Sequence, residues 1–254
     1  MAAPQKLING LTDLGMEKMQ EYLDHYSELV NKGDKSFSEA LEELVEIEKK
    51  NKQVRRDAIN LHIANYPFIK TFDDFDFDFQ PNLNKKEILE LSKLGFVESK
   101  ENVIFVGTSG VGKTHLATAL GICCTKARFQ TYFITFENLI TQLKKAYQEN
   151  RLESRLKFFS KYKVLIIDEI GYMPIDSDTA NIFFQLIAKR YEKNSTIITT
   201  NMPFSKWGEF FGSATLANAV LDRLLHHSEV ISIKGPSYRI KDKRLVLEAQ
   251  AAEE

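Results

Sequence analysis

An octapeptide with the spacing G-x-x-x-x-G-K-T follows the apolar run 103–106 and carries the clearest chemistry in this sequence. It consists of Gly107, Thr108, Ser109, Gly110, Val111, Gly112, Lys113 and Thr114. Glycines let successive backbone N–H groups point inward around phosphate oxygens, and the helix that follows offers the positive end of its dipole to the same anion. We expect Lys113 to reach the β- and γ-phosphates and the Thr114 hydroxyl to bind Mg²⁺. The motif predicts a nucleoside triphosphate site, and its glycine spacing differs from the dinucleotide fingerprint G-x-G-x-x-G.

Two carboxylates, Asp168 and Glu169, follow the apolar residues 164–167, a pattern that resembles the Walker B element of phosphate-loop ATPases. Asp168 is expected to bind Mg²⁺ through water, and Glu169 to orient and deprotonate the attacking water. An Asp-Glu pair after a strand is common by itself, but the upstream phosphate loop favours the functional interpretation. The second carboxylate favours an ATPase over a kinase, because only hydrolysis needs a base for water.

Asn201 ends another apolar run, 195–200. Its side-chain amide could hold the lytic water or a γ-phosphate oxygen between strands. The alternative is an asparagine that only caps a turn before Pro203.

Arg223 ends an apolar helix in which no local pattern requires an arginine. A planar guanidinium suits the charge that develops on a transferred phosphoryl group, and ring-forming ATPases often supply it from a neighbouring subunit. A surface salt bridge with Asp222 or Glu229 is an equally common explanation for a lone arginine. Arg190 is a weaker candidate for the same role, and Arg239 could contact phosphate from the C-terminal side.

The histidines are expected to be mainly structural. His115 follows Thr114 and is included among the nucleotide-contacting positions because of this place in the chain. His226 and His227 adjoin each other without a third metal ligand at suitable spacing. No metal beyond nucleotide-bound Mg²⁺ is therefore expected.

The composition suits one nucleotide-binding domain with a small appendage: the chain has 254 residues, 43% of them hydrophobic. No run approaches the roughly 20 apolar residues that cross a bilayer, and the first residues lack the apolar run of a signal peptide, so we expect a cytoplasmic protein without membrane contact. The adjacent Cys123 and Cys124 are expected in a helical core. Because the net charge is −1, affinity for nucleic acid must come from local basic patches.

From residue 102 onward, strand and helix patterns alternate. Strands are predicted at 102–106, 130–135, 163–168, 195–200 and 229–233. Helices are predicted at about 113–126, 137–149, 178–192 and 215–226. The alternation and the apolar strands indicate an α/β fold with a parallel sheet sandwiched by helices. Nucleotide chemistry is then expected at the carboxyl ends of the strands.

The first third of the chain has helical periodicity and no strand signal. One helix is expected from Leu11 to Val30, and a second begins at a capping box formed by Ser36 and Glu39. Proline after Tyr66 ends the pattern, which predicts an N-terminal helical domain at 1–66 for partner or DNA binding and an ATPase domain at 67–254.

Phenylalanines and aspartates alternate over 72–79, which suits an extended stretch with the aromatic rings inward. Packing of a linker and contact of one or two rings with an adenine base both remain open. Asn84 and Glu87 are expected to cap a helix that Gly95 terminates.

Several motifs together resemble the IstB family, the AAA+ helper ATPases of bacterial insertion sequences, which are relatives of DnaC-type replicative helicase loaders. The D-E-x-G-Y-x-P run at 168–174 and the D-R-L-L-H-H run at 222–227 are the most specific, and the phosphate loop alone would prove little. Further similarity lies at 14–16, 38–41, 71–77, 200–204 and 207–208, so the resemblance covers nearly the whole chain.

The resemblance implies a P-loop AAA+ fold that binds ATP and Mg²⁺, assembles on duplex DNA into a homo-oligomer with ATP at subunit interfaces, and recruits an IstA-like transposase for target selection. It implies that Lys113, Thr114, Asp168, Glu169 and Asn201 act in cis and Arg223 in trans. About 20 residues follow the last predicted strand, so a full helical lid and a conventional sensor role for Arg239 are not expected.

Two basic clusters could contact DNA phosphates with little base preference, although a solvated helix face explains any single lysine as well. They contain Lys144, Lys145, Arg151, Arg155, Lys157, Lys161 and Lys163, and Lys234, Arg239, Lys241, Lys243 and Arg244. Three alternatives stay open: a DnaC-like helicase loader, a P-loop phosphotransferase, and a scaffold that binds ATP without hydrolysing it.

Overall fold

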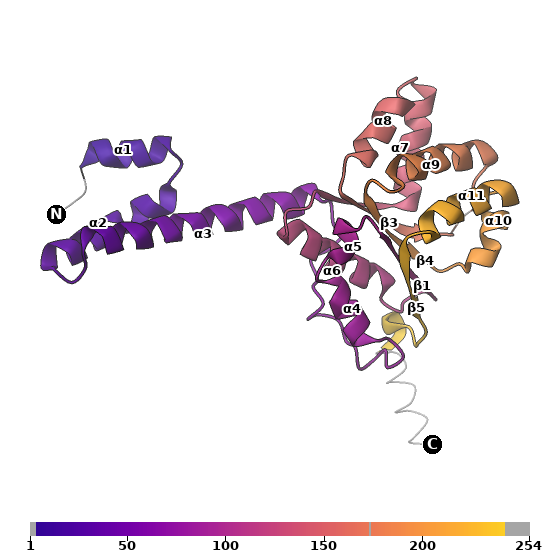
Figure 1. Cartoon of the computed structure of the whole chain (residues 1–254), viewed down its shortest axis with the longest axis horizontal. Helices are drawn as coiled ribbons and strands as arrows, with labels where there is room; N and C mark the ends of the chain where they lie inside the picture. The colour runs from indigo at the N-terminus through magenta and orange to yellow at the C-terminus, as the bar shows by residue number, and fades with distance from the viewer. Residues whose placement is uncertain (1–3, 173, 242–254) are drawn as a thin grey trace, which may run out of the picture. The chain divides into compact units, whose positions relative to one another are not determined.

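The computed structural model describes residues 4–172 and 174–241, and the chain divides into two compact units, 1–60 and 61–254 (Figure 1). The second unit begins ahead of the boundary that the sequence suggested after Tyr66. No helix within the described ranges is long and apolar enough to cross a membrane.

The first unit is helical and contains α1 (Gln5–Asp13), α2 (Glu17–Lys32) and most of α3 (Phe37–Ile63). The single helix expected from Leu11 to Val30 is wrong, because a turn at Gly15, whose φ is 63°, separates α1 from α2. The expected capping box is confirmed: the Ser36 N–H donates to Glu39 Oε2 at 2.8 Å, and the Glu39 N–H to Ser36 Oγ at 3.3 Å.

The second unit is built on a five-stranded parallel sheet with the order β2-β3-β4-β1-β5, which confirms the α/β expectation. The strands are β1 (Asn102–Gly107), β2 (Thr131–Thr135), β3 (Val164–Ile170), β4 (Ser195–Thr200) and β5 (Ser228–Ile233). Since β1 and β3 both flank β4, the residues that follow these three strands meet at one edge of the sheet.

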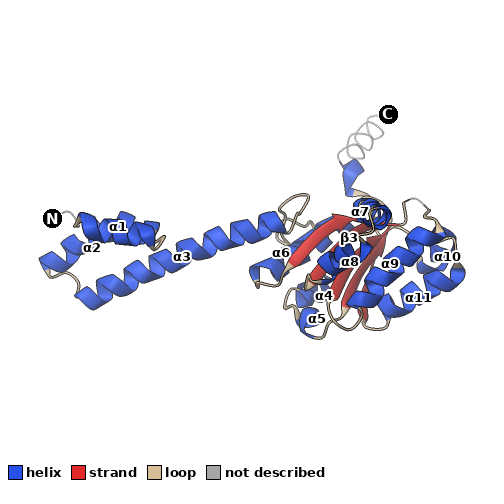
Figure 2. Cartoon of the chain, turned by 90° about the horizontal axis from the view of Figure 1, so that it is seen from above, coloured by secondary structure: helices blue, strands red, loops and turns tan. Residues whose placement is uncertain are grey.

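Helices cover both faces of the sheet, as the two views show (Figures 1 and 2). One face carries α4 (Lys85–Leu91), α5 (Gly95–Glu98) and α6 (Lys113–Lys126). The other carries α7 (Phe136–Gln148), α8 (Leu152–Ser160), α9 (Ser177–Arg190), α10 (Trp207–Phe210) and α11 (Ala214–Leu225). Successive side chains of β1 pack on opposite faces of the sheet. Ile104 belongs to the hydrophobic core on the face covered by α7–α11, and Val103 and Phe105 belong to the core on the face covered by α4–α6. All three are fully buried, so the sheet position is fixed from both sides.

Three local expectations differ from the structure. Residues 72–79 form turns instead of an extended stretch, although Phe72 and Phe75 are buried as expected. The helix capped by Asn84 ends at Leu91, and Leu94, not Gly95, takes the left-handed conformation with φ 65°. Helix α8 was not expected from the sequence.

Arg190 lies at the end of α9 and is a core residue, which makes its suggested role as an arginine finger wrong. Its guanidinium donates to Thr196 Oγ1 at 3.0 Å, to the carbonyls of Phe159 (2.9 Å) and Tyr162 (2.8 Å), and to the Ser195 carbonyl. Burial lowers its pKa to about 9. The side chain thereby joins α8, α9 and the start of β4 through buried carbonyl and hydroxyl acceptors.

Arg190→Ala is expected to lower the free energy of unfolding by about 3 kcal/mol or more, because several buried acceptors lose their donor. Lys189→Ala is the matched control, since Lys189 makes an exposed pair with Glu153 and should change stability by less than about 1 kcal/mol. Urea unfolding of both variants measures the difference, and equal midpoints would refute this role of Arg190.

Candidate functional site

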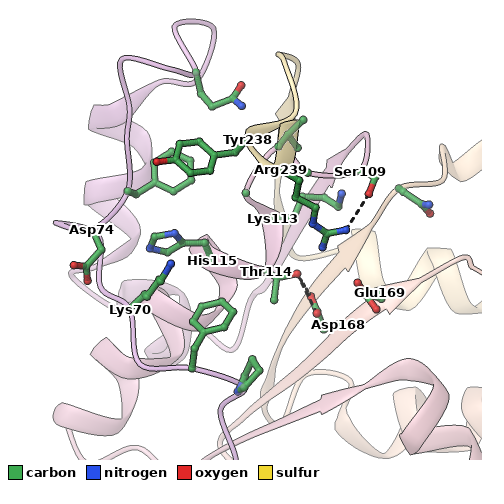
Figure 3. A pocket seen from close by; sticks show the side chains of 18 of the residues that line it. Lys70, Asp74, Ser109, Lys113, Thr114, His115, Asp168, Glu169, Tyr238 and Arg239 are labelled. Atoms are coloured by element: carbon green, nitrogen blue, oxygen red, sulfur yellow. Dashed lines mark hydrogen bonds between the residues drawn. The ribbon is translucent and has the colours of Figure 1, made fainter. Parts of the chain in front are cut away.

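A pocket of about 420 Å³ lies at the carboxyl ends of β1, β3 and β4 in the second unit (Figure 3). Its lining includes most of the residues that the sequence singled out: Ser109, Gly110, Val111, Gly112, Lys113, Thr114, His115, Asp168, Glu169 and Asn201. Gly107, the last residue of β1, and Thr108 belong to the same motif without lining the pocket. Three separate motifs therefore converge on one cavity.

The phosphate loop is shaped by glycines in conformations that other residues rarely adopt. Gly110 and Gly112 have φ of 81° and 98°, and a Cβ on Gly112 would lie 2.6 Å from the Phe75 ring. Lys113 begins α6 and donates from Nζ to the Thr108 carbonyl at 2.7 Å. Burial lowers the pKa of Lys113, and Asp168 partly opposes this shift. A phosphate anion in the loop would favour the charged form of Lys113 and supply a stronger acceptor than a carbonyl.

Asp168 is held between two threonine hydroxyls at the end of β3. Thr114 Oγ1 lies 3.0 Å from each carboxylate oxygen, as the dashed line in Figure 3 marks, and Thr199 Oγ1 lies 2.6 Å from Oδ1. The side chain is only 3% exposed. Burial raises the pKa of Asp168, while the hydrogen bonds from Thr199 and Thr114 lower it. A nearby cation would complete the compensation of this charge.

The donor set at this point fits Mg²⁺, which prefers oxygen ligands. Thr114 brings a hydroxyl and Asp168 a carboxylate to within hydrogen-bond distance of each other. Asn201 also lines the pocket, and its Oδ1 is buried without a hydrogen-bond partner in the described part of the chain. An unpartnered polar atom next to these groups is consistent with a polar ligand bound in the pocket.

Glu169 lines the same pocket with an unusual backbone. Its φ is 65°, a left-handed conformation that costs a side-chain-bearing residue free energy. The β3–β4 register shifts at this point, between Ile167 and Ile170. Such irregularities next to sites re-aim side chains.

Aromatic residues form the other wall of the pocket. Of the phenylalanines in 72–79, only Phe75 is part of the lining, where its ring lies 5.3 Å from the His115 ring. His115 Nε2 hydrogen-bonds the Thr71 carbonyl at 2.9 Å, and burial lowers the pKa of the imidazole. His115 thus packs against Phe75 in the pocket wall, as a structural residue would. Because it also lines the pocket, it could contact a bound ligand.

The sequence did not single out several lining residues as parts of a site: Phe68, Lys70, Tyr172 and Tyr238. Asp74, in the stretch whose carboxylates were expected to face outward, also lines the pocket. Tyr172 lies in the D-E-x-G-Y-x-P run, and Tyr238 directly precedes Arg239. Their position next to candidate site residues could therefore have indicated that they line the pocket. Phe68 and Lys70 follow the expected domain boundary, and nothing in their local pattern indicates a site.

The remaining arginines differ in their relation to the pocket. Arg239 lines it and lies 3.4 Å from Ser109 Oγ through Nη1 (Figure 3). Arg223 is not among the lining residues; its guanidinium stacks 4.6 Å from the Phe184 ring centre and donates to the Ala219 carbonyl. The salt bridges considered for Arg223 with Asp222 or Glu229 do not form within the described residues.

His226 and His227 have a third potential ligand after all, which corrects the expectation from spacing. Glu192 follows α9 and comes within 4.8 Å of both histidines, measured between possible ligand atoms. All three side chains are exposed, and His226 Nδ1 is 2.6 Å from the Tyr191 hydroxyl. Linear spacing missed Glu192 because packing of α9 against α11 brings these segments together.

Many residues of the basic clusters already have partners. Lys144 pairs with Asp176 at 2.7 Å, Arg151 pairs with Glu149, and Arg155 stacks on aromatic rings of α8. In the second cluster, Lys241 pairs with Asp76 at 2.8 Å, whereas Lys243 and Arg244 lie outside the described residues. The clusters are therefore less available to DNA than their sequence suggests, and Lys145 and Lys157 remain exposed.

The model of the family "IstB-like ATP binding protein" matches residues 9–246. This chain belongs to that family. The ATP-binding protein of insertion sequence IS232 from Bacillus thuringiensis is 49% identical over 94% of this chain and 95% of its own length. The corresponding protein of IS21 from Pseudomonas aeruginosa is 45% identical over 92% of this chain and 88% of its own length. Both relatives are named as ATP-binding proteins of insertion sequences.

Solved structures with the same fold come from replication proteins. The DnaC helicase loader matches 59% of this IstB-like chain and 87% of its own chain with a TM-score of 0.52 and 28% identity. AMPPCP-bound DnaA from Aquifex aeolicus matches 70% of this chain and 55% of its own, with a TM-score of 0.55. At 17% identity, the DnaA likeness shows the fold alone. Together with the DnaC match, the parallel sheet and its flanking helices give the second unit an AAA+ P-loop fold.

Lys113→Ala is expected to weaken ATP binding by at least about 100-fold, because a charge-assisted contact to phosphate is lost from a partly buried site. Lys126→Ala is the matched control, since Lys126 is exposed in the last turn of the same helix. Titration with a fluorescent ATP analogue measures both affinities. An unchanged affinity of Lys113→Ala would remove the phosphate loop from the nucleotide site.

Proposed function

We propose that this protein hydrolyses ATP in the pocket at the ends of β1, β3 and β4, and that it uses the ATP cycle to assemble on duplex DNA and assist a transposase. The observation that carries the hydrolysis proposal is the paired Asp168 and Glu169 at the strand end, facing the phosphate loop across one cavity. A phosphotransferase has no need for a second carboxylate that acts on water.

In the proposed reaction, each side chain has a separate task. Glu169 orients the attacking water and accepts its proton, while Asn201 donates a hydrogen bond to that water or to the γ-phosphate. Lys113 and the backbone N–H groups of the loop stabilise the charge on the phosphate oxygens. Thr114 and Asp168 would hold Mg²⁺, which would neutralise part of the charge on the phosphate oxygens.

Arg223 is proposed to act on the ATP bound by a neighbouring copy of the chain. It lies in the last turn of α11, which leads into the start of β5, whereas the pocket lies at the opposite, carboxyl ends of the strands. Because Arg223 is absent from the lining of its own pocket, a contribution to hydrolysis requires a second subunit. This supports a homo-oligomer with ATP at subunit interfaces.

The comparisons favour transposition over helicase loading. Insertion-sequence relatives match 92–94% of the chain at 44–49% identity, while the DnaC loader matches 59% of it at 28% identity. The helical first unit exposes Phe37, Leu41 and Val45 at helical spacing on α3. An exposed apolar stripe of this kind suits contact with a partner protein, which we propose is the transposase.

Glu169→Gln is expected to keep ATP affinity within about threefold of wild type and to lower phosphate release at least about 100-fold, since the base is lost and the shape is kept. Glu209→Gln, an exposed exchange on α10, is the control. Phosphate release is measured with Mg²⁺ and duplex DNA present. A Glu169→Gln variant that turns over like the control would support the non-hydrolysing scaffold instead.

Arg223→Ala is expected to lower turnover while leaving ATP binding by isolated subunits intact. Mixing Arg223→Ala with Lys113→Ala should then restore part of the activity, because the first variant offers a working pocket and the second a working arginine. The rate of the mixture is compared with each variant alone. If mixing restores nothing and Arg223→Ala loses ATP affinity as monomer, Arg223 acts in cis.

A further inference from the structure

We infer that Thr199 is a positioning residue that sets the conformation of both carboxylates of the site, an assignment that rests on the proposed hydrolysis. Thr199 is a fully buried residue of β4 and is not part of the pocket lining. It therefore touches no ligand, and any influence on chemistry must pass through Asp168 and Glu169.

The Thr199 hydroxyl makes two hydrogen bonds of opposite direction. It donates to Asp168 Oδ1 at 2.6 Å and accepts from the Glu169 N–H at 2.9 Å. A hydroxyl has one hydrogen, so the bond to Asp168 fixes the orientation in which its lone pair can face Glu169. A β-branched side chain has few rotamers, which makes this a stiff link between the two residues.

The link lies where the β3–β4 pairing is interrupted. Ile167 pairs with Ile198, and Ile170 pairs with Thr200, so Asp168 and Glu169 together face Thr199 alone. This is the arrangement of a β-bulge, in which one backbone donor loses its ladder partner. The Thr199 hydroxyl takes the place of that partner for the Glu169 N–H.

The bulge determines where the Glu169 side chain points. Glu169 has a φ of 65°, and a residue with a side chain keeps this conformation only where surrounding contacts hold it. Loss of the Thr199 hydroxyl would leave the Glu169 N–H without its acceptor and remove one of the hydroxyls that orient Asp168. The expected consequence is a misaligned base and a poorer cation site, with the phosphate loop itself untouched.

Thr199→Val tests this assignment, with Thr199→Ser as the conservative variant and Thr118→Val as the matched control. Thr118 is also a fully buried threonine, but its hydroxyl has no hydrogen-bond partner within the described residues. For each protein we would measure kcat and KM for ATP, and the affinity for a fluorescent ATP analogue in Mg²⁺ and in EDTA.

Thr199→Val should lower kcat at least about 10-fold while KM and affinity in EDTA stay within about threefold of wild type. The gain in affinity that Mg²⁺ confers should shrink, because Asp168 is less well oriented. Thr199→Ser should recover most of kcat and of the Mg²⁺ effect, and Thr118→Val should resemble wild type in all readouts.

A Thr199→Val variant whose kcat and Mg²⁺ effect match those of Thr118→Val would overturn the assignment. So would a variant that loses affinity in EDTA as much as kcat and is not recovered by serine, since this pattern indicates general damage to the fold. Wild-type protein that binds ATP without releasing phosphate would overturn the proposed function instead, and the Mg²⁺ effect on binding would still decide the role of Thr199.

Discussion

The buried carboxylate of Asp168 is the constraint on which the geometry of the site depends. A carboxylate at 3% exposure is costly unless donors surround it, and here the donors are hydroxyls from the start of α6 and from β4. Thr114 ties it to the phosphate loop, and Thr199 ties it to the neighbouring strand. The relative position of the three motifs is therefore set by one hydrogen-bonded carboxylate. Burial raises the pKa of Asp168 and favours its neutral form, while the two hydroxyls lower the pKa and favour the charged form.

The left-handed backbone at Glu169 persists because the residues around it cannot move. Ile167, Ile170 and Ile198 are fully buried on either side of the interruption in the β3–β4 pairing. Because these isoleucines are closely packed, they fix the backbone on both sides of Glu169. The free energy gained by burying them compensates for the strain at Glu169. If Glu169 acts as the proposed base, a side chain that is held in this way needs little reorganisation when a water molecule enters, which favours acid–base catalysis.

The sequence predicted the parts that depend on local pattern: the five strands to within a few residues, the phosphate loop, and the polar residues after β3 and β4. It could not predict features that arise from packing between distant segments. Arg190 and Arg223 both follow apolar helical runs. Arg190 is buried because acceptors from distant segments, such as the carbonyls of Phe159 and Tyr162, surround its guanidinium. Glu192 joins His226 and His227 for the same reason. Residues 72–79 alternate like a strand, yet they fold into turns, with the Phe72 and Phe75 rings buried against the second unit's core.

The two ends of the sheet explain why one subunit is not expected to complete the proposed reaction. The pocket lies where the strands end, whereas α11 carries Arg223 towards the edge where β5 begins. Assembly would join these opposite ends from different copies and so link hydrolysis to oligomer formation. The same arrangement suits a chain with a net charge of −1 in which Lys144, Arg151 and Lys241 of the basic clusters are paired with carboxylates. Each copy would offer few phosphate contacts, but linked copies bind at a high effective concentration, so affinity for DNA would arise from the assembly and not from the single chain.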